Sequence, residues 1–146
     1  MKKMMIILTM LAISSFVKAQ VDNDTLAIQK AALNYLEGWY SGNVERMDQA
    51  LHPELAKRNQ QKIPNTEIEL INSLTKNTML EYTKAGAGTR TPKDKINNKV
   101  KILHIYKGIA TAVALSYDYV DYLHLVKTRD GWRIINVLWE MQDHEE

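Results

Sequence analysis

Residues 119–140 read YVDYLHLVKTRDGWRIINVLWE, and they give the clearest indication of the fold. Apolar and polar residues alternate on both sides of residues 128–131, which is the two-residue period of a β-strand. The four residues between the alternating runs end in Gly131, as is typical of a hairpin with a type I turn and a G1 bulge. The sequence therefore predicts an antiparallel hairpin whose extra residue lies at Gly131.

This register assigns the side chains of the hairpin to two faces. His124 lies opposite Asn136 and Tyr122 opposite Leu138, on the face that also carries Val126, Trp132 and Ile134. The other face is apolar and carries Leu123, Leu125, Ile135, Val137 and Trp139. Left in water, it would exceed the apolar patch that monomers usually expose. We expect this apolar face to form a twofold homodimer with Trp139 near its centre.

The rest of the chain places helices before strands. Leu26, Leu33, Leu36 and Tyr40 recur at helical spacing after possible N-caps at residues 22–24. Residues 100–105, 109–117 and 118–127 alternate as strands before the last strand at 132–140. Helices followed by a meander predict an α+β fold with helices packed on one face of an antiparallel sheet.

Weaker sequence patterns predict the elements that lie between the first helix and the later strands. Gly42 suits the left-handed position after the first helix, and Asn43 caps a second helix that ends at His52, before Pro53. We expect Arg46, Lys57 and Arg58 on the solvent-exposed side.

Residues 67–71 alternate like a short strand, and Ser73 is a candidate cap for a helix over 74–83. Residues 86–92 have the composition of a loop and lack the features of a P-loop.

Residues 1–19 have the three parts of a secretory signal peptide. Lys2 and Lys3 precede an uncharged apolar run, and residues 17–19 form a cleavage site with small flanking residues. The run is shorter than a membrane span and is broken by Ser14. We therefore expect residues 20–146 to be a single exported domain, periplasmic or extracellular, with no membrane segment after cleavage.

Composition excludes several classes of protein. The chain has 146 residues, no cysteine, and 19 basic against 17 acidic residues. Without cysteine there is no disulfide, thiolate metal site or cysteine nucleophile. Signal cleavage would remove three lysines, leaving 16 basic and 17 acidic residues. This balance does not indicate nucleic-acid binding.

Four segments carry a resemblance to a known family. Residues 35–43, 51–58, 119–127 and 132–140 resemble the bacterial putative lumazine-binding family, and the similarity covers nearly all of residues 20–140. That family lies within the nuclear-transport-factor-2-like superfamily, also called cystatin-like, which includes ketosteroid isomerase, scytalone dehydratase and the SnoaL-like cyclases. The resemblance implies a cone-like curved antiparallel sheet wrapped by N-terminal helices, an internal pocket, and frequent dimers through the sheet.

Candidate site residues come from a short list of polar and aromatic side chains. Tyr35 and Trp39 share a helix face, where they either pack in the core or stack on a planar heteroaromatic ligand. His124, with Tyr122 and Asn136, either holds a polar ligand or supports the sheet. His52 suits a helix C-terminus, and the resemblance places it near the pocket mouth. His spacings typical of metal sites are absent, and we expect neither metal nor cofactor.

Two functions follow from these residues together with what the resemblance implies. In the first, the protein is an exported small-molecule-binding protein, and a planar heteroaromatic such as a lumazine-like compound is a candidate ligand. In the second, it is a small lyase, isomerase or cyclase in which His124 and Asp121 act as an acid–base pair.

Overall fold

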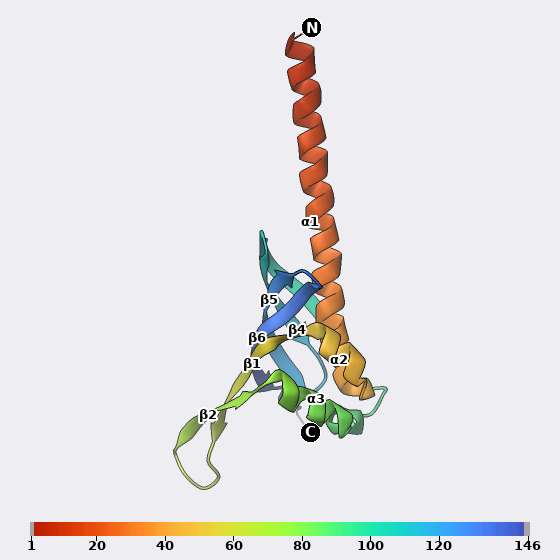
Figure 1. Ribbon diagram of the computed structural model, residues 1–146. Helices are drawn as coiled ribbons and strands as arrows, with labels where there is room; N and C mark the ends of the chain where they lie inside the picture. The colour runs from red at the N-terminus through yellow and green to blue at the C-terminus, as the bar shows by residue number, and fades with distance from the viewer. Residues whose placement is uncertain (1, 145–146) are drawn as a thin grey trace.

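The computed structural model describes the backbone of residues 2–144 and the side chains of residues 22–144. Figure 1 shows the chain order: α1 (Lys2–Ser41), α2 (Val44–Ala50), β1 (Leu51–Lys62), β2 (Glu69–Leu74), α3 (Lys76–Lys84), the 3-10 helix η1 (Ala87–Arg90), β3 (Lys99–Tyr106), β4 (Ile109–Leu115), β5 (Tyr119–Thr128) and β6 (Gly131–Met141). The predicted signal peptide, residues 1–19, lies outside the described side chains. Within the described part of the chain, no helix has the length and apolar character needed to span a bilayer.

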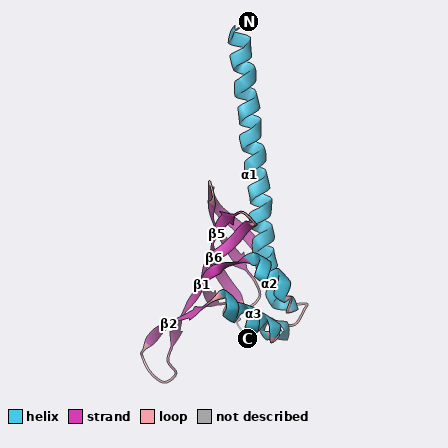
Figure 2. Ribbon diagram, viewed as in Figure 1, coloured by secondary structure: helices cyan, strands magenta, loops and turns pink. Residues whose placement is uncertain are grey.

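The six strands form one sheet with the helices against it, so the predicted α+β class is confirmed (Figure 2). The strand order is β2-β1-β6-β5-β4-β3, which contains the predicted meander of β3 to β6. Residues 51–62, part of which was assigned to the end of a helix, instead form β1. This strand pairs parallel with β6, whereas the other neighbours are antiparallel. The helix ends at Ala50, two residues earlier than predicted, because the chain enters the sheet at Leu51.

Helix α1 lies against the sheet through one face of its C-terminal half. Ile28, Ala32 and Leu36 are fully or almost fully buried there, whereas Leu26 is 66% exposed and lies outside the apolar stripe predicted for it. The Asp24 carboxylate accepts hydrogen bonds from Lys127 Nζ at 2.6 Å and from Trp132 Nε1 at 3.0 Å. These bonds attach the helix to the hairpin of β5 and β6.

Two of the four predicted helix caps are confirmed. Gly42 is left-handed (φ 67°), and the Asn43 side chain accepts a hydrogen bond from the Arg46 backbone N–H, as predicted. Helix α3 is capped by Thr75 and not by Ser73, because Ser73 belongs to β2. Helix α1 is continuous through residues 22–24, where a cap was expected.

The extra residue of the β5–β6 hairpin lies in mid-strand. Thr128 pairs with Gly131, and His124 pairs with Asn136 as predicted, but Leu125 pairs with Ile134, so Ile135 is the unpaired residue. An unpaired residue reverses the alternation of faces on the bulged strand. Trp132, Ile134, Val137 and Trp139 therefore all face inward, and the prediction that Trp132 and Ile134 share a face with Asn136 is wrong.

The face predicted to form a dimer is the inner face of the sheet. Leu123 and Leu125 are each 1% exposed and Val137 is 2% exposed, because the helices cover them within one chain. Assigning them to an outer surface was wrong, because the helices pack on this side of the sheet. Of the predicted set, Ile135, the unpaired residue of the bulge, lies on the outer face. The outer face instead exposes Tyr122 (56%) and Leu138 (60%).

Residues 86–92 contain η1 and pack closely on α1. Gly86 is left-handed (φ 72°), and a side chain at Gly88 would meet the backbone and indole of Trp39 at about 2.5 Å. Only a glycine allows this approach. The segment predicted to be a loop thus forms a close-fitting strap over Trp39.

Candidate functional site

A cavity of about 220 Å³ opens between the inner face of the sheet and the helices. Six aromatic side chains contribute to its lining: Tyr35, Trp39, Tyr40, Tyr82, Tyr119 and Trp139. They come from α1, α3, β5 and β6, so segments far apart in the sequence build one wall. Among the residues described, Lys57 and Asp121 are the only charged ones that line it.

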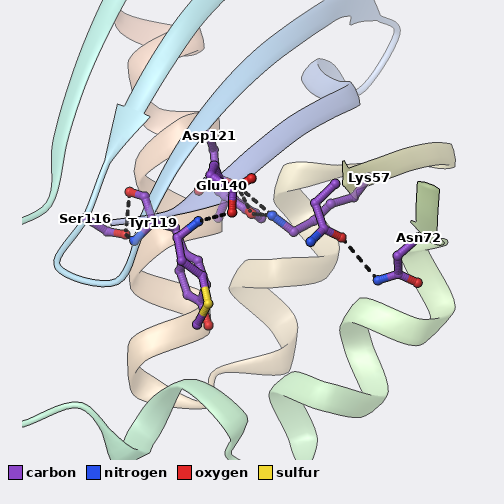
Figure 3. Close-up of polar contacts among 9 residues, drawn as sticks. Lys57, Asn72, Ser116, Tyr119, Asp121 and Glu140 are labelled. Carbon is purple, nitrogen blue, oxygen red and sulfur yellow. Dashed lines mark hydrogen bonds and ion pairs between the residues drawn. The ribbon is translucent and has the colours of Figure 1, made fainter. Parts of the chain in front are cut away.

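Lys57 and Asp121, which both line the cavity, form a buried ion pair (Figure 3). Lys57 Nζ lies 2.6 Å from Asp121 Oδ1, and the two residues are 6% and 1% exposed. The Tyr35 hydroxyl completes a triangle, donating to Asp121 Oδ1 at 2.9 Å and accepting from Lys57 Nζ at 2.8 Å. The three groups satisfy one another in a place where water would otherwise be needed.

The ammonium of Lys57 is also surrounded by aromatic rings. Its Nζ lies 4.5 Å from the ring centroid of Trp139 and 6.0 Å from that of Tyr119. Tyr119 meets Trp139 edge-on at 5.2 Å and Trp39 edge-on at 6.4 Å. Cation–π attraction and edge-to-face packing hold these rings in fixed orientations around the charge.

Burial shifts the proton affinities of the cavity groups. Desolvation lowers the pKa of Lys57, and the neighbouring Asp121 carboxylate only partly opposes that effect. Burial, followed by the charge of Asp121, raises the pKa of Tyr35 well above its usual value. Tyr35 is therefore a neutral hydrogen-bond donor across the physiological pH range, beside a lysine that holds its proton less tightly than usual.

The rim of the cavity is fixed by a second polar cluster. The Tyr40 hydroxyl donates to Asp118 Oδ2 at 3.0 Å, and the Thr91 hydroxyl donates to the same oxygen at 2.6 Å. Burial raises the pKa of Tyr40 to about 12. Because Thr91 directly follows η1, this cluster joins the strap over Trp39 to the turn before β5.

Sequence comparison identifies the family of this chain. The family model described as putative lumazine-binding matches residues 23–140. The chain belongs to the putative lumazine-binding family. No curated protein shows significant similarity to it.

Solved structures share the fold of this family member at low sequence identity. A nuclear-transport-factor-2-like protein of unknown function from Silicibacter pomeroyi aligns with a TM-score of 0.64 at 10% identity, over 84% of this chain and 98% of that one. A similar protein from Methylobacillus flagellatus gives 0.60 at 16% identity, over 83% and 94%. A cystatin-like domain from Nostoc punctiforme gives 0.59 at 11%, over 84% and 79%. These likenesses confirm the nuclear-transport-factor-2-like, cystatin-like fold.

The site residues predicted from sequence fall into separate places. Tyr35 and Trp39 line the inner cavity, whereas His124 and Asn136 line a hollow on the outer face, where Tyr122 is also exposed. The expectation of one shared cavity is wrong, because these two groups lie on opposite sides of the sheet.

His52 and the proposed acid–base pair are also placed differently from the prediction. The Nδ1 atom of His52 accepts a hydrogen bond from the Glu54 backbone at the start of β1, and His52 does not line the cavity. Asp121 faces inward and His124 outward, because they are three residues apart on one strand. They therefore cannot act together at one site.

Sequence reasoning missed Lys57, which was expected in solvent. Leu55, Lys57 and Asn59 are the buried residues at alternate positions of β1, where the strand crosses the inner face. Two of these three are polar, so hydropathy gives no sign of a strand. Tyr119 and Trp139 were recognised as strand residues, but their meeting with Lys57 depends on β1 lying beside β6.

Changing the ion pair tests its energetic role. Asp121→Leu alone leaves the buried Lys57 ammonium without its carboxylate partner. It should therefore lower the free energy of unfolding by about 3–5 kcal/mol. Lys57→Met alone should lower the free energy of unfolding by a similar amount, because the buried Asp121 carboxylate loses its cation. The double variant should be more stable than the sum of the two losses predicts, by more than about 1 kcal/mol, in urea denaturation. Additive losses would contradict direct coupling.

Proposed function

We propose that the protein binds a small, planar, partly aromatic molecule in the inner cavity. The observation that carries this proposal is a cavity lined by aromatic rings and by one neutralised ion pair. Ligand pockets typically combine apolar walls with a few fixed polar groups that orient the ligand.

The size of the cavity restricts the ligand. An engineered cavity of about 150 Å³ accommodates benzene. The volume of about 220 Å³ here therefore suits one ring with substituents or a compact fused pair of rings. A lumazine-like bicycle, the ligand class named in the family description, is the candidate that we favour. Its ring faces would lie against Tyr119 or Trp39, and its carbonyl oxygens would accept a hydrogen bond from Lys57.

A matched pair of tyrosine variants tests the location of this ligand. Tyr119 and Tyr122 lie three residues apart on β5, one lining the cavity and the other on the outer face. Tyr119→Leu should weaken lumazine binding about tenfold in calorimetric titration, because it removes one stacking ring. Tyr122→Leu should leave the affinity unchanged. If both variants bind lumazine as tightly as the wild-type protein does, the ligand lies outside the cavity.

We also propose that the protein is exported and begins at Gln20 after cleavage. The basic start, apolar run and small residues at 17 and 19 support this processing. Intact mass of the protein recovered from the periplasm or medium of its host should correspond to residues 20–146. Retention of residues 1–19 in mature protein would contradict export by this route.

We further propose a twofold homodimer through the outer face of the sheet. Tyr122 and Leu138 are paired across β5 and β6 and are both more than half exposed, next to the hollow lined by Ile109 and Ile135. Such an apolar surface is typical of an interface between subunits. A second copy of the same face would cover it with self-complementary contacts.

Charged substitutions on this face test the dimer. Tyr122→Glu combined with Leu138→Glu should give a monomer in light scattering at tens of micromolar, because each charge would have to be buried. The control is Leu26→Glu on α1, which changes a similarly exposed apolar residue (66%) on the helix side of the sheet. A wild-type monomer, or a dimer that survives both changes, would contradict the proposal.

A further inference from the structure

Lys57 is the only buried lysine among residues 22–144, and it lies on the wall of a cavity that is open to ligands. A structural ion pair needs no access to a cavity. Here the ammonium is placed among the rings of Trp139, Tyr35 and Tyr119, at 4.5 to 6.0 Å from their centroids. A molecule that enters the cavity thus meets Lys57, whose ammonium lies among these rings.

The surroundings of Lys57 favour nucleophilic chemistry. A lysine amine attacks carbonyl carbons only when it is deprotonated, and desolvation among apolar groups is the usual way to promote that form. Burial lowers the pKa of Lys57 despite the carboxylate beside it. Two groups that can move protons are within hydrogen-bond distance, the Tyr35 hydroxyl at 2.8 Å and Asp121 Oδ1 at 2.6 Å.

We propose that Lys57 captures an aldehyde or ketone in the inner cavity as a reversible imine. This inference rests on the proposed function, because it uses the same cavity as the ligand site. It adds a covalent step and a substrate class, a small aromatic or unsaturated carbonyl compound, that binding by stacking alone does not require.

The protons and electrons of this step balance within the site. Lys57 passes a proton to Asp121, and the lone pair on Nζ then forms a bond to the carbonyl carbon. The π electrons move to the oxygen, which takes a proton from Tyr35, and Asp121 reprotonates Tyr35. The nitrogen then gives a second proton to Asp121. When this proton is relayed to the hydroxyl group, water leaves and the nitrogen lone pair forms the C=N bond.

The charge of the site is the same before and after the reaction. An ammonium paired with a carboxylate becomes an iminium paired with the same carboxylate, with one carbonyl consumed and one water released. Asp121 therefore stabilises the product as it stabilises the starting pair, and no new charge is buried. Tyr35 acts as the proton relay between Asp121 and the oxygen, a role suited to a hydroxyl that both donates and accepts here.

Reductive trapping of the wild-type protein tests the proposal. Benzaldehyde is used as the probe because a single substituted ring fits the cavity, with sodium cyanoborohydride at pH 7 to convert any iminium to a stable secondary amine. Peptide mapping then measures the rate of benzylation at every lysine. We expect Lys57 to react at least tenfold faster than the exposed Lys101 and Lys107, which serve as internal controls.

Variants and a competitor separate this inference from binding alone. Lys57→Arg keeps a cation at this position and should abolish the fast adduct, and bound lumazine should slow it by occupying the cavity. Slow or absent benzylation of wild-type Lys57 while exposed lysines react would overturn the imine. If lumazine binds in that case, the proposed function stands without it, and if neither probe enters the cavity, both proposals fail. Mapping of the wild-type protein distinguishes these outcomes even where the Lys57→Arg variant does not fold.

Discussion

The contact between Lys57 and Asp121 fixes the geometry on which the rest of the cavity depends. Lys57 is on β1 and Asp121 on β5, with β6 between them, so the lysine side chain must cross the inner face over Trp139. Two buried charges this close to apolar rings are costly unless they stay paired. That cost penalises any change in the relative positions of β1, β5 and β6, and it holds Tyr35 of α1 at the same point.

The parallel pairing of β1 with β6 and the bulge at Ile135 make this contact possible. The pairing aligns Lys57 with Val137, two residues before Trp139 on the inner face. The bulge lets both halves of β6 face the helices, with Trp132 and Ile134 before it and Val137 and Trp139 after it. Without the extra residue, one half of the strand would turn its apolar residues to solvent. Core and cavity therefore depend both on the parallel pairing of β1 with β6 and on the bulge at Ile135.

Sequence reasoning succeeded where the signal is local and failed where it depends on strand neighbours. The caps at Gly42 and Asn43, the turn at 128–131 and the pairing of His124 with Asn136 follow from nearby residues. The bulge could not be located, because Ile134 and Ile135 are both apolar and either fits an alternating pattern. Lys57 was missed because a buried lysine is identified only by the strand that brings its partner, and that partner lies 64 positions away.

The ion pair is better explained by the cavity than by stability. Replacing a buried pair with apolar residues of similar volume is often neutral or stabilising, so the fold alone does not require lysine and aspartate here. The same pair gives a largely aromatic cavity, which Gln61, Asn72 and Ser116 also line, a donor, an acceptor and a neighbouring hydroxyl without adding net charge. Neutral ligands with a carbonyl group would find both partners, whereas a charged ligand would bring an unpaired charge into a site already neutralised. In the binding role that we propose, the pair would thus select neutral carbonyl compounds, which the aromatic rings of the cavity can also contact.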